Sequence, residues 1–167
     1  MFKLKVIEHA NLSEHDVDEI IRIKSIAWIY PYEKQLEWLK INLKDSDLHL
    51  LLYEDDMAVA YLNLISIELI IDTITYCALG VGNVCAIEKG KGYGAELMKK
   101  TNQYIANENS LGLLFCKISL IDFYKKFDWG IVEETKLNLS FRNDNIITML
   151  FNFSFPFEKL IYSAQIF

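Results

Sequence analysis

Three glycines fall within five residues, at Gly90, Gly92 and Gly94, where an apolar stretch changes into a helical pattern. Glycine lets the backbone approach a ligand closely, and the first N–H groups of a helix point outward with the positive end of its dipole. Lys89 and Lys91 add local positive charge. The combination is typical of a phosphate-binding turn, and the plain alternative is a tight turn with solvated lysines.

Two well-known phosphate motifs fit this segment poorly. A Walker A loop requires Gly-Lys followed by Ser or Thr, which is absent here. A Rossmann fingerprint matches Gly90, Gly92 and Ala95 as GxGxxA, but it requires an acidic ribose ligand about twenty residues further on. The end of the next predicted strand carries Lys117 instead, and the chain lacks further βα units. The order of the elements must therefore decide what the turn does.

The elements that hold the turn follow from apolar spacing and from turn residues. Ser13 and Asp16 predict a capping box before a first helix, and Pro31 marks the start of a second. Gly80 and Gly82 predict a bulge in a long strand. Strands are predicted at 2–8, 48–53, 57–70, 73–87, 113–118, 131–140 and 146–154, and further helices at 92–107 and 121–127.

This order predicts a mixed α+β fold in which helices flank a mostly antiparallel sheet, within a single domain of residues 1–167. The strand–helix–strand step from residue 84 to residue 118 implies one parallel pair of strands. The last two strands would form a terminal hairpin, separated by the turn 142–145. The apolar tail 155–167 would cover the sheet or pair with a second copy, which makes a homodimer a further hypothesis.

Composition limits the possible partners. Seventeen Lys plus Arg against twenty-three Asp plus Glu give a net charge of −6, so no global field draws the chain to nucleic acid or to an anionic membrane. Three widely spaced cysteines without a CxxC pair argue against a disulfide framework and a zinc site, and favour a cytoplasmic location. We expect no signal peptide and no membrane segment.

Two segments resemble signatures of the GCN5-related N-acetyltransferase (GNAT) superfamily. Residues 89–94, KGKGYG, resemble its Gln/Arg-x-x-Gly-x-Gly/Ala pattern, with Lys89 in place of Arg or Gln. Residues 123–129, FYKKFDW, resemble its Phe-Tyr-x-x-x-Gly-Phe/Trp pattern, with Asp128 in place of glycine. The predicted element order also matches that of the family. The second segment and the strand before it are similar to the aminoglycoside 2′-N-acetyltransferase-like branch.

The resemblance implies that the chain binds acetyl-CoA as cosubstrate, without a metal. The pyrophosphate would lie on Lys89, Gly90, Lys91, Gly92, Tyr93, Gly94 and Ala95. The pantetheine arm would pair with the main chain of Val84, Cys85 and Ala86, in the splay between the fourth and fifth strands. Tyr124 would protonate the leaving thiolate, and its alternative role is aromatic packing.

The general base is left open, because residues 73–86 contain no Asp, Glu or His. A water chain to Glu33, Glu68, Asp72 or His49 would serve, as would an amine that arrives neutral. The sequence thus favours an N-acetyltransferase that acts by direct transfer on a primary amine. A small-molecule amine is expected and the acidic balance favours a polycationic one, while a protein N-terminus stays open as the acceptor. The alternative is a non-catalytic acyl-CoA-binding sensor or interaction module.

Overall fold

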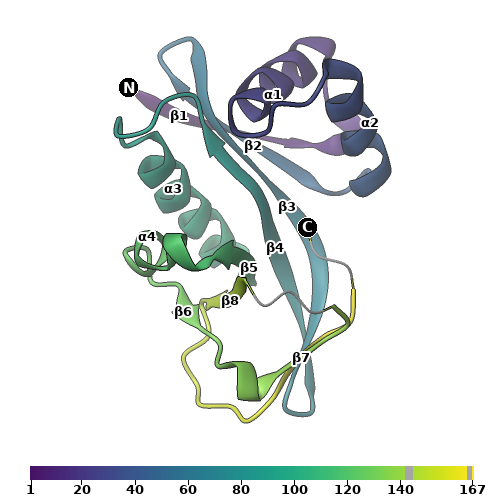
Figure 1. Ribbon diagram of the computed structural model, residues 1–167, viewed down its shortest axis with the longest axis vertical. Coiled ribbons are helices and arrows are strands. Elements are labelled where there is room, and N and C mark those ends of the chain that lie inside the picture. The colour runs from purple at the N-terminus through teal and green to yellow at the C-terminus, as the bar shows by residue number, and fades with distance from the viewer. Residues whose placement is uncertain (142–144, 165–166) are drawn as a thin grey trace. The chain divides into compact units, whose positions relative to one another are not determined.

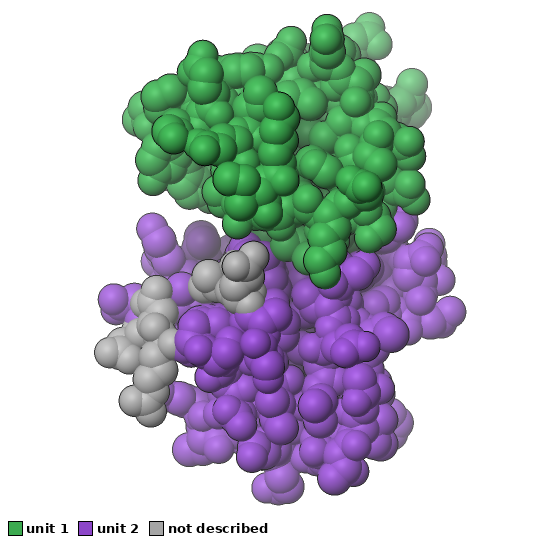
Figure 2. All heavy atoms as spheres, turned by 90° about the vertical axis from the view of Figure 1, so that its right-hand side faces the viewer, with its two compact units in different colours: residues 1–65, 82–101 green, residues 66–81, 102–167 purple. Residues whose placement is uncertain are grey.

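The computed structural model describes residues 1–141, 145–164 and 167. These residues divide into two compact units, shown in Figure 2, and each is described by itself. The first unit comprises Met1–Ile65 and Gly82–Thr101, and the second comprises Ser66–Val81 and Asn102–Phe167. Two long strands, β3 and β4, contribute residues to both units (Figure 1). The turn predicted at 142–145 lies mostly outside the described residues.

The first unit contains an antiparallel meander and three helices. The strands are β1 (Phe2–Glu8), β2 (Leu48–Glu54), the first part of β3 (Met57–Ile71) and the last part of β4 (Ile74–Ala86). The helices are α1 (Glu14–Ala27), α2 (Tyr32–Asn42) and most of α3 (Tyr93–Asn107), with a 3-10 turn η1 (His9–Asn11). The predicted order of strands and helices is therefore confirmed from the first strand up to the helix predicted at 92–107.

Local signals set the start of the first two helices. The Ser13 hydroxyl accepts a hydrogen bond from the Asp16 backbone N–H at 3.2 Å, and the Asp16 carboxylate accepts one from the Ser13 N–H at 3.2 Å. This confirms the predicted capping box. Pro31 stands immediately before α2, where its missing N–H costs nothing. Buried apolar residues of α1, α2 and the strands then form the core of this unit.

The second unit contains the parallel pair that the sequence predicted. The first part of β4 runs parallel to β5 (Leu111–Lys117), and the pairing extends from Ala78–Leu111 to Val81–Leu114. β5 is antiparallel to β8 (Ile146–Phe151). The remaining elements are β6 (Gly130–Ile131), β7 (Leu137–Leu139), β9 (Leu160–Tyr162), α4 (Ile121–Lys125), η2 (Ile118–Leu120) and η3 (Glu134–Lys136).

The predicted single strand at 131–140 and the terminal hairpin are wrong. The η3 turn interrupts the segment, where the Lys136 N–H donates to the Glu133 carbonyl at 2.9 Å. Only the short β6 pairs with β8, whereas β7 pairs with β9 from the apolar tail, and β9 also pairs with β3. Alternating apolar residues identify a strand but do not specify the strand that it pairs with. β9 from the apolar tail therefore pairs with β7 in place of the predicted partner, the strand at 146–154.

The second GNAT-like segment keeps its turn despite the loss of its glycine. Asp128 has a φ of 62°, a left-handed conformation that Asp tolerates better than most residues. The following Trp129 is 1% exposed, and its indole N–H donates to Asn102 at 3.0 Å. A Cβ on Gly112 would lie only 3.2 Å from the Trp129 Cζ2 atom, so the ring accounts for the glycine within β5. β5 begins at Leu111, two residues before the predicted start at residue 113.

Candidate functional site

The glycine-rich loop between β4 and α3 has the backbone conformation that the sequence indicated. Gly90 and Gly92 both have a φ of 82°, which side-chain-bearing residues rarely adopt. A Cβ at either position would find no heavy atom within 4 Å. The two glycines are thus required by the backbone and not by crowding, and the space above them is open to a ligand.

The start of α3 is held by residues of the same unit. The Glu96 N–H donates to the Gly92 carbonyl at 3.0 Å and closes the first helical turn. The Tyr93 hydroxyl donates to the Glu54 carboxylate at 2.8 Å, and its ring stands edge-on to Phe2. Because Tyr93 is only 8% exposed and its hydroxyl is bonded to Glu54, its side chain anchors the start of the helix.

The two lysines of the loop are exposed and only weakly paired. Lys91 lies 3.8 Å from the Glu88 carboxylate, and both side chains are more than half exposed. An exposed pair of this kind contributes about 0–1 kcal/mol, so it leaves Lys91 available to a stronger anion. Within the loop, Lys89 is likewise exposed.

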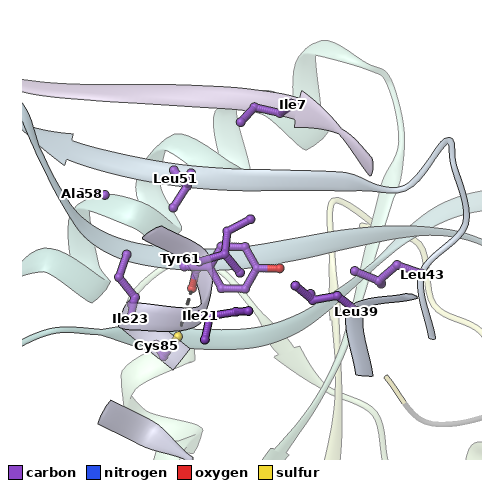
Figure 3. Packing of buried hydrophobic residues seen from close by; sticks show 10 residues of the cluster. Ile7, Ile21, Ile23, Leu39, Leu43, Leu51, Ala58, Tyr61 and Cys85 are labelled. Atoms are coloured by element: carbon purple, nitrogen blue, oxygen red, sulfur yellow. Dashed lines mark hydrogen bonds between the residues drawn. The ribbon is translucent and has the colours of Figure 1, made fainter. Parts of the chain in front are cut away.

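The strand before the loop directs alternate side chains to opposite faces. Cys85 points into the core of the first unit, where its thiol lies 3.8 Å from the Tyr61 carbonyl (Figure 3). Burial raises the pKa of Cys85 to about 12, so this thiol is not a nucleophile at neutral pH. Val84 and Ala86 are half-buried, and their main chain lies in the segment beyond the last β4–β5 pair.

The irregularity predicted at Gly80 and Gly82 falls on the next residue. Asn83 has a φ of 54°, and its side-chain Nδ2 donates to the side-chain Oδ1 of Asn63 at 2.7 Å. Asn63 is fully buried, and within the described part of the chain its own Nδ2 has no hydrogen-bond partner. A distortion therefore lies directly before Val84, as the pattern required, although the asparagine carries it.

Tyr124 belongs to the second unit, on α4. It is 5% exposed, and its ring contacts Phe123 with centroids 5.0 Å apart. Burial raises the pKa of Tyr124 above its usual range, so the phenol stays protonated at neutral pH. That state suits a proton donor and excludes a base.

The four suggested sources of a general base have different surroundings. Glu33 is exposed in the first turn of α2, and Glu68 is exposed in the second unit. Asp72 accepts the backbone N–H groups of residues 158 and 159, each at 2.9 Å, and so anchors the tail. His49 is fully buried, with its Nδ1 2.8 Å from the Tyr61 hydroxyl and its Nε2 3.0 Å from the His9 Nδ1.

Burial and the nearby charges of His9 and Lys24 lower the pKa of His49 to about 3. The imidazole is therefore neutral at ordinary pH and does not readily hold the proton that a general base must accept. Asp16 lies near enough to favour the charged form slightly.

Lys24 is a buried cation that sequence reasoning missed. It is 2% exposed on α1, its Nζ lies 3.9 Å from the Trp38 ring centroid, and no carboxylate of the described residues pairs with it. Burial lowers the pKa of Lys24 to about 8. The available signal was its position, because it continues the apolar stripe of Val17, Ile20 and Ile21.

No group of three His, Cys, Asp or Glu side chains that could hold a metal ion occurs among the described residues. Within the same part of the chain, none of the helices has the length and apolar character needed to cross a membrane.

Comparison with known proteins identifies the fold. The E. coli ElaA crystal structure covers 91% of this chain and 100% of its own, with 20% identity and a TM-score of 0.63. A Pseudomonas aeruginosa acyl-CoA N-acyltransferase covers 90% and 99%, with 16% identity and a TM-score of 0.64. Campylobacter jejuni N-acetyltransferase PseH in complex with acetyl coenzyme A covers 91% and 100%, with 15% identity and a TM-score of 0.61. At these identities the likeness establishes the mixed α+β acyltransferase fold. No curated protein matches the chain.

The family itself is established from the sequence. The profile of the family described as an acetyltransferase (GNAT) domain matches residues 8–132, which include the glycine loop and both predicted signatures. The match covers well over half of the chain. The chain therefore belongs to the GNAT family of acetyltransferases.

Proposed function

We propose that this protein transfers the acetyl group of acetyl-CoA to a primary amine of a small molecule. The observation that carries the proposal is the loop 89–94, whose residues 89–92 are exposed and in which two left-handed glycines lead into a firmly anchored helix. Outward N–H groups and two lysines supply what a diphosphate needs in a protein of net charge −6.

The residues present fit the cosubstrate. The loop residues Lys89, Gly90, Lys91, Gly92, Tyr93, Gly94 and Ala95 would hold the diphosphate, chiefly through backbone N–H groups. The main chain of Val84, Cys85 and Ala86 would pair with the pantetheine arm as an added strand. Open space above Gly90 and Gly92 supports the assignment, because a Cβ at either position would enter it.

Direct transfer within a ternary complex is favoured over a covalent acetyl-enzyme. A covalent route needs a thiolate, and burial raises the pKa of Cys85 to about 12 and that of Cys116 to about 11. In the direct route a neutral amine nitrogen attacks the thioester carbonyl carbon, the nitrogen then loses a proton to water, and the C–S bond breaks. The thiolate takes its proton from Tyr124, which solvent then reprotonates.

The acceptor class follows from charge. The excess of acidic side chains attracts a cation, so a polycationic amine such as a polyamine or an aminoglycoside is the preferred acceptor. The three free cysteines agree with the cytoplasmic location expected from the sequence. Homodimer formation stays a prediction.

Release of free thiol from acetyl-CoA in the presence of a panel of amines tests the proposal. Cys77 is free and exposed to thiol reagents, so each rate is corrected by a reaction without amine. We expect release with at least one amine and a matching acetylated product by mass spectrometry.

A non-catalytic acyl-CoA-binding module is the second candidate, because residues 73–86 carry no acidic or histidine side chain. Thermal stabilisation by acetyl-CoA without turnover on any amine would support this module and refute the enzyme.

A further inference from the structure

Asn83 has a backbone conformation that is unusual for its place in the fold. Its φ of 54° is left-handed, yet the residue lies inside β4. Every other side-chain-bearing residue with a positive φ in the described part of the chain lies outside the strands and helices. Asparagine tolerates the left-handed region better than most residues, but inside a strand such a residue persists only where its surroundings hold it.

The contact that holds Asn83 comes from Asn63 of β3, within the same compact unit. The Asn83 Nδ2 atom donates to the Asn63 Oδ1 atom at 2.7 Å. Asn63 is 0% exposed, and its own Nδ2 has no hydrogen-bond partner among the residues that the structure describes. Burying an unpaired amide N–H costs stability, and an apolar side chain of similar size would avoid that cost. The bond from Asn83 to Oδ1 is therefore what an asparagine contributes here.

The bend at Asn83 lies directly before the main chain that would pair with the pantetheine arm. Beyond that segment, the Ile87 N–H donates to the Val59 carbonyl of β3 at 2.9 Å. Backbone groups of successive strand residues point to opposite edges, so the N–H groups of Val84 and Ala86 point away from β3. A left-handed residue in a strand bends it and changes the direction of the residues that follow. The conformation of Asn83 therefore sets where these two N–H groups point.

We propose that Asn63 is a positioning residue for the cosubstrate. By holding the Asn83 side chain, it fixes the left-handed bend that directs the main chain of residues 84–86 toward the pantetheine arm. Asn63 has no exposed surface, so it acts through Asn83 and not by touching the cosubstrate. The inference rests on the proposed function and adds to it a residue on a neighbouring strand. All of these residues belong to the first unit.

Calorimetric titration of the folded protein with acetyl-CoA tests the inference. Asn63→Leu keeps the approximate size of the side chain and removes the Oδ1 acceptor. We expect it to raise the Kd for acetyl-CoA by about 2- to 10-fold, which corresponds to the loss of one hydrogen bond. Asn83→Val should raise the Kd at least as much, because a β-branched side chain strongly disfavours a positive φ. Asn83 is only half-buried, so the fold tolerates this change.

Asn83→Gly provides the comparison that separates positioning from stability. Glycine adopts a φ of 54° without a side chain to hold it there, so the Kd of this variant should stay within about two-fold of the wild type. Adding Asn63→Leu to Asn83→Gly should then cause no further loss of affinity. A role of Asn63 in stability alone predicts the same loss in both backgrounds.

Asn42→Leu is the matched control. Asn42 is a partly exposed asparagine of α2 whose Nδ2 donates to the Trp38 carbonyl at 2.9 Å, and its loss should leave the Kd unchanged. If Asn63→Leu does not fold, Asn63→Ala, which adds no bulk, replaces it in both backgrounds.

The outcomes separate the two proposals. A wild type that does not bind acetyl-CoA refutes the proposed function and the inference with it. A wild type that binds acetyl-CoA no better than Asn63→Leu overturns only the inference about Asn63. Equal losses of affinity from Asn63→Leu with and without Asn83→Gly, or a similar loss in Asn42→Leu, also overturn it.

Discussion

Lys24→Met should stabilise the protein, because the wild-type side chain is a cation buried without a carboxylate partner among the described residues. Its pKa falls from 10.5 to about 8, and each pKa unit corresponds to about 1.4 kcal/mol, so burial costs about 3 kcal/mol below pH 8. Attraction to the Trp38 ring returns about 0.5–2 kcal/mol. Methionine has a similar length and packs well in irregular apolar surroundings. We therefore expect a gain of about 1–3 kcal/mol in the free energy of unfolding at pH 7.

The pH dependence identifies the cause. The folded pKa is lower than the unfolded one, so between pH 8 and pH 10.5 the unfolded chain binds more protons than the folded chain. Wild-type stability attributable to Lys24 must then rise with pH across this window. The difference between Lys24→Met and the wild type should be largest below pH 8 and vanish near pH 10.5.

Urea unfolding followed by circular dichroism and tryptophan fluorescence at pH 7, 9 and 10.5 measures this difference. Lys40→Met is the matched control, since Lys40 is an exposed lysine of α2, and its effect should stay within about 0.5 kcal/mol. A Lys24→Met protein that is less stable than the control at pH 7, by an amount that does not change with pH, would refute the reasoning.

The remaining predictions concern the loop, the acid, a packed glycine and the buried histidine. Gly92→Asp should weaken acetyl-CoA binding, measured by calorimetry, more than Gly92→Asn does. Both side chains must adopt the same left-handed backbone conformation, and only Asp adds a negative charge. Equal affinities of the two variants would contradict the proposed phosphate site. Tyr124→Phe should lower kcat by about 10²- to 10⁴-fold with little change in acetyl-CoA affinity, and unchanged turnover would remove Tyr124 from the mechanism. Gly112→Ala should lower the free energy of unfolding by about 1–3 kcal/mol, because the added Cβ would collide with Trp129. Gly130→Ala should have a much smaller effect, because a Cβ at Gly130 would lie 3.8 Å from its nearest neighbour. Similar losses in the two variants would argue against this explanation from packing. The folded pKa of His49, about 3, lies below the unfolded value of 6.5. Acidification from pH 6.5 toward 3 should therefore lower the free energy of unfolding of the wild type by up to about 5 kcal/mol relative to His49→Gln. Parallel pH profiles of the two proteins in urea unfolding would contradict this.

Features decided by local chemistry were predicted correctly from the sequence. The capping box at Ser13 and the glycine-rich turn at Gly90 and Gly92 depend on side chains and backbone angles within a few residues. The same holds for the turn at Asp128, whose left-handed backbone replaces that of a glycine. Family signatures built from such local features were therefore recognisable before any fold was known.

Features decided by distant partners were not predictable from the pattern. The strand around Leu137 was expected to pair with its neighbour in sequence, but it pairs with β9, because strand periodicity carries no information about the partner. The buried state of Lys24 was missed for a similar reason, since its burial depends on α2 and β4 as well as on its own helix.

The sequence by itself determined the GNAT family, the acyltransferase class and the place of the glycine-rich loop, because these follow from short segments whose chemistry is complete locally. Only the tertiary structure showed that Cys85 is sealed in a core, that His49 is held neutral, and that Phe167 lies against Gly80. Those properties arise from burial and from contacts between residues far apart in the chain. Burial removes water from a charge or a thiol only once the surrounding elements have packed, and no spacing within a single segment encodes that.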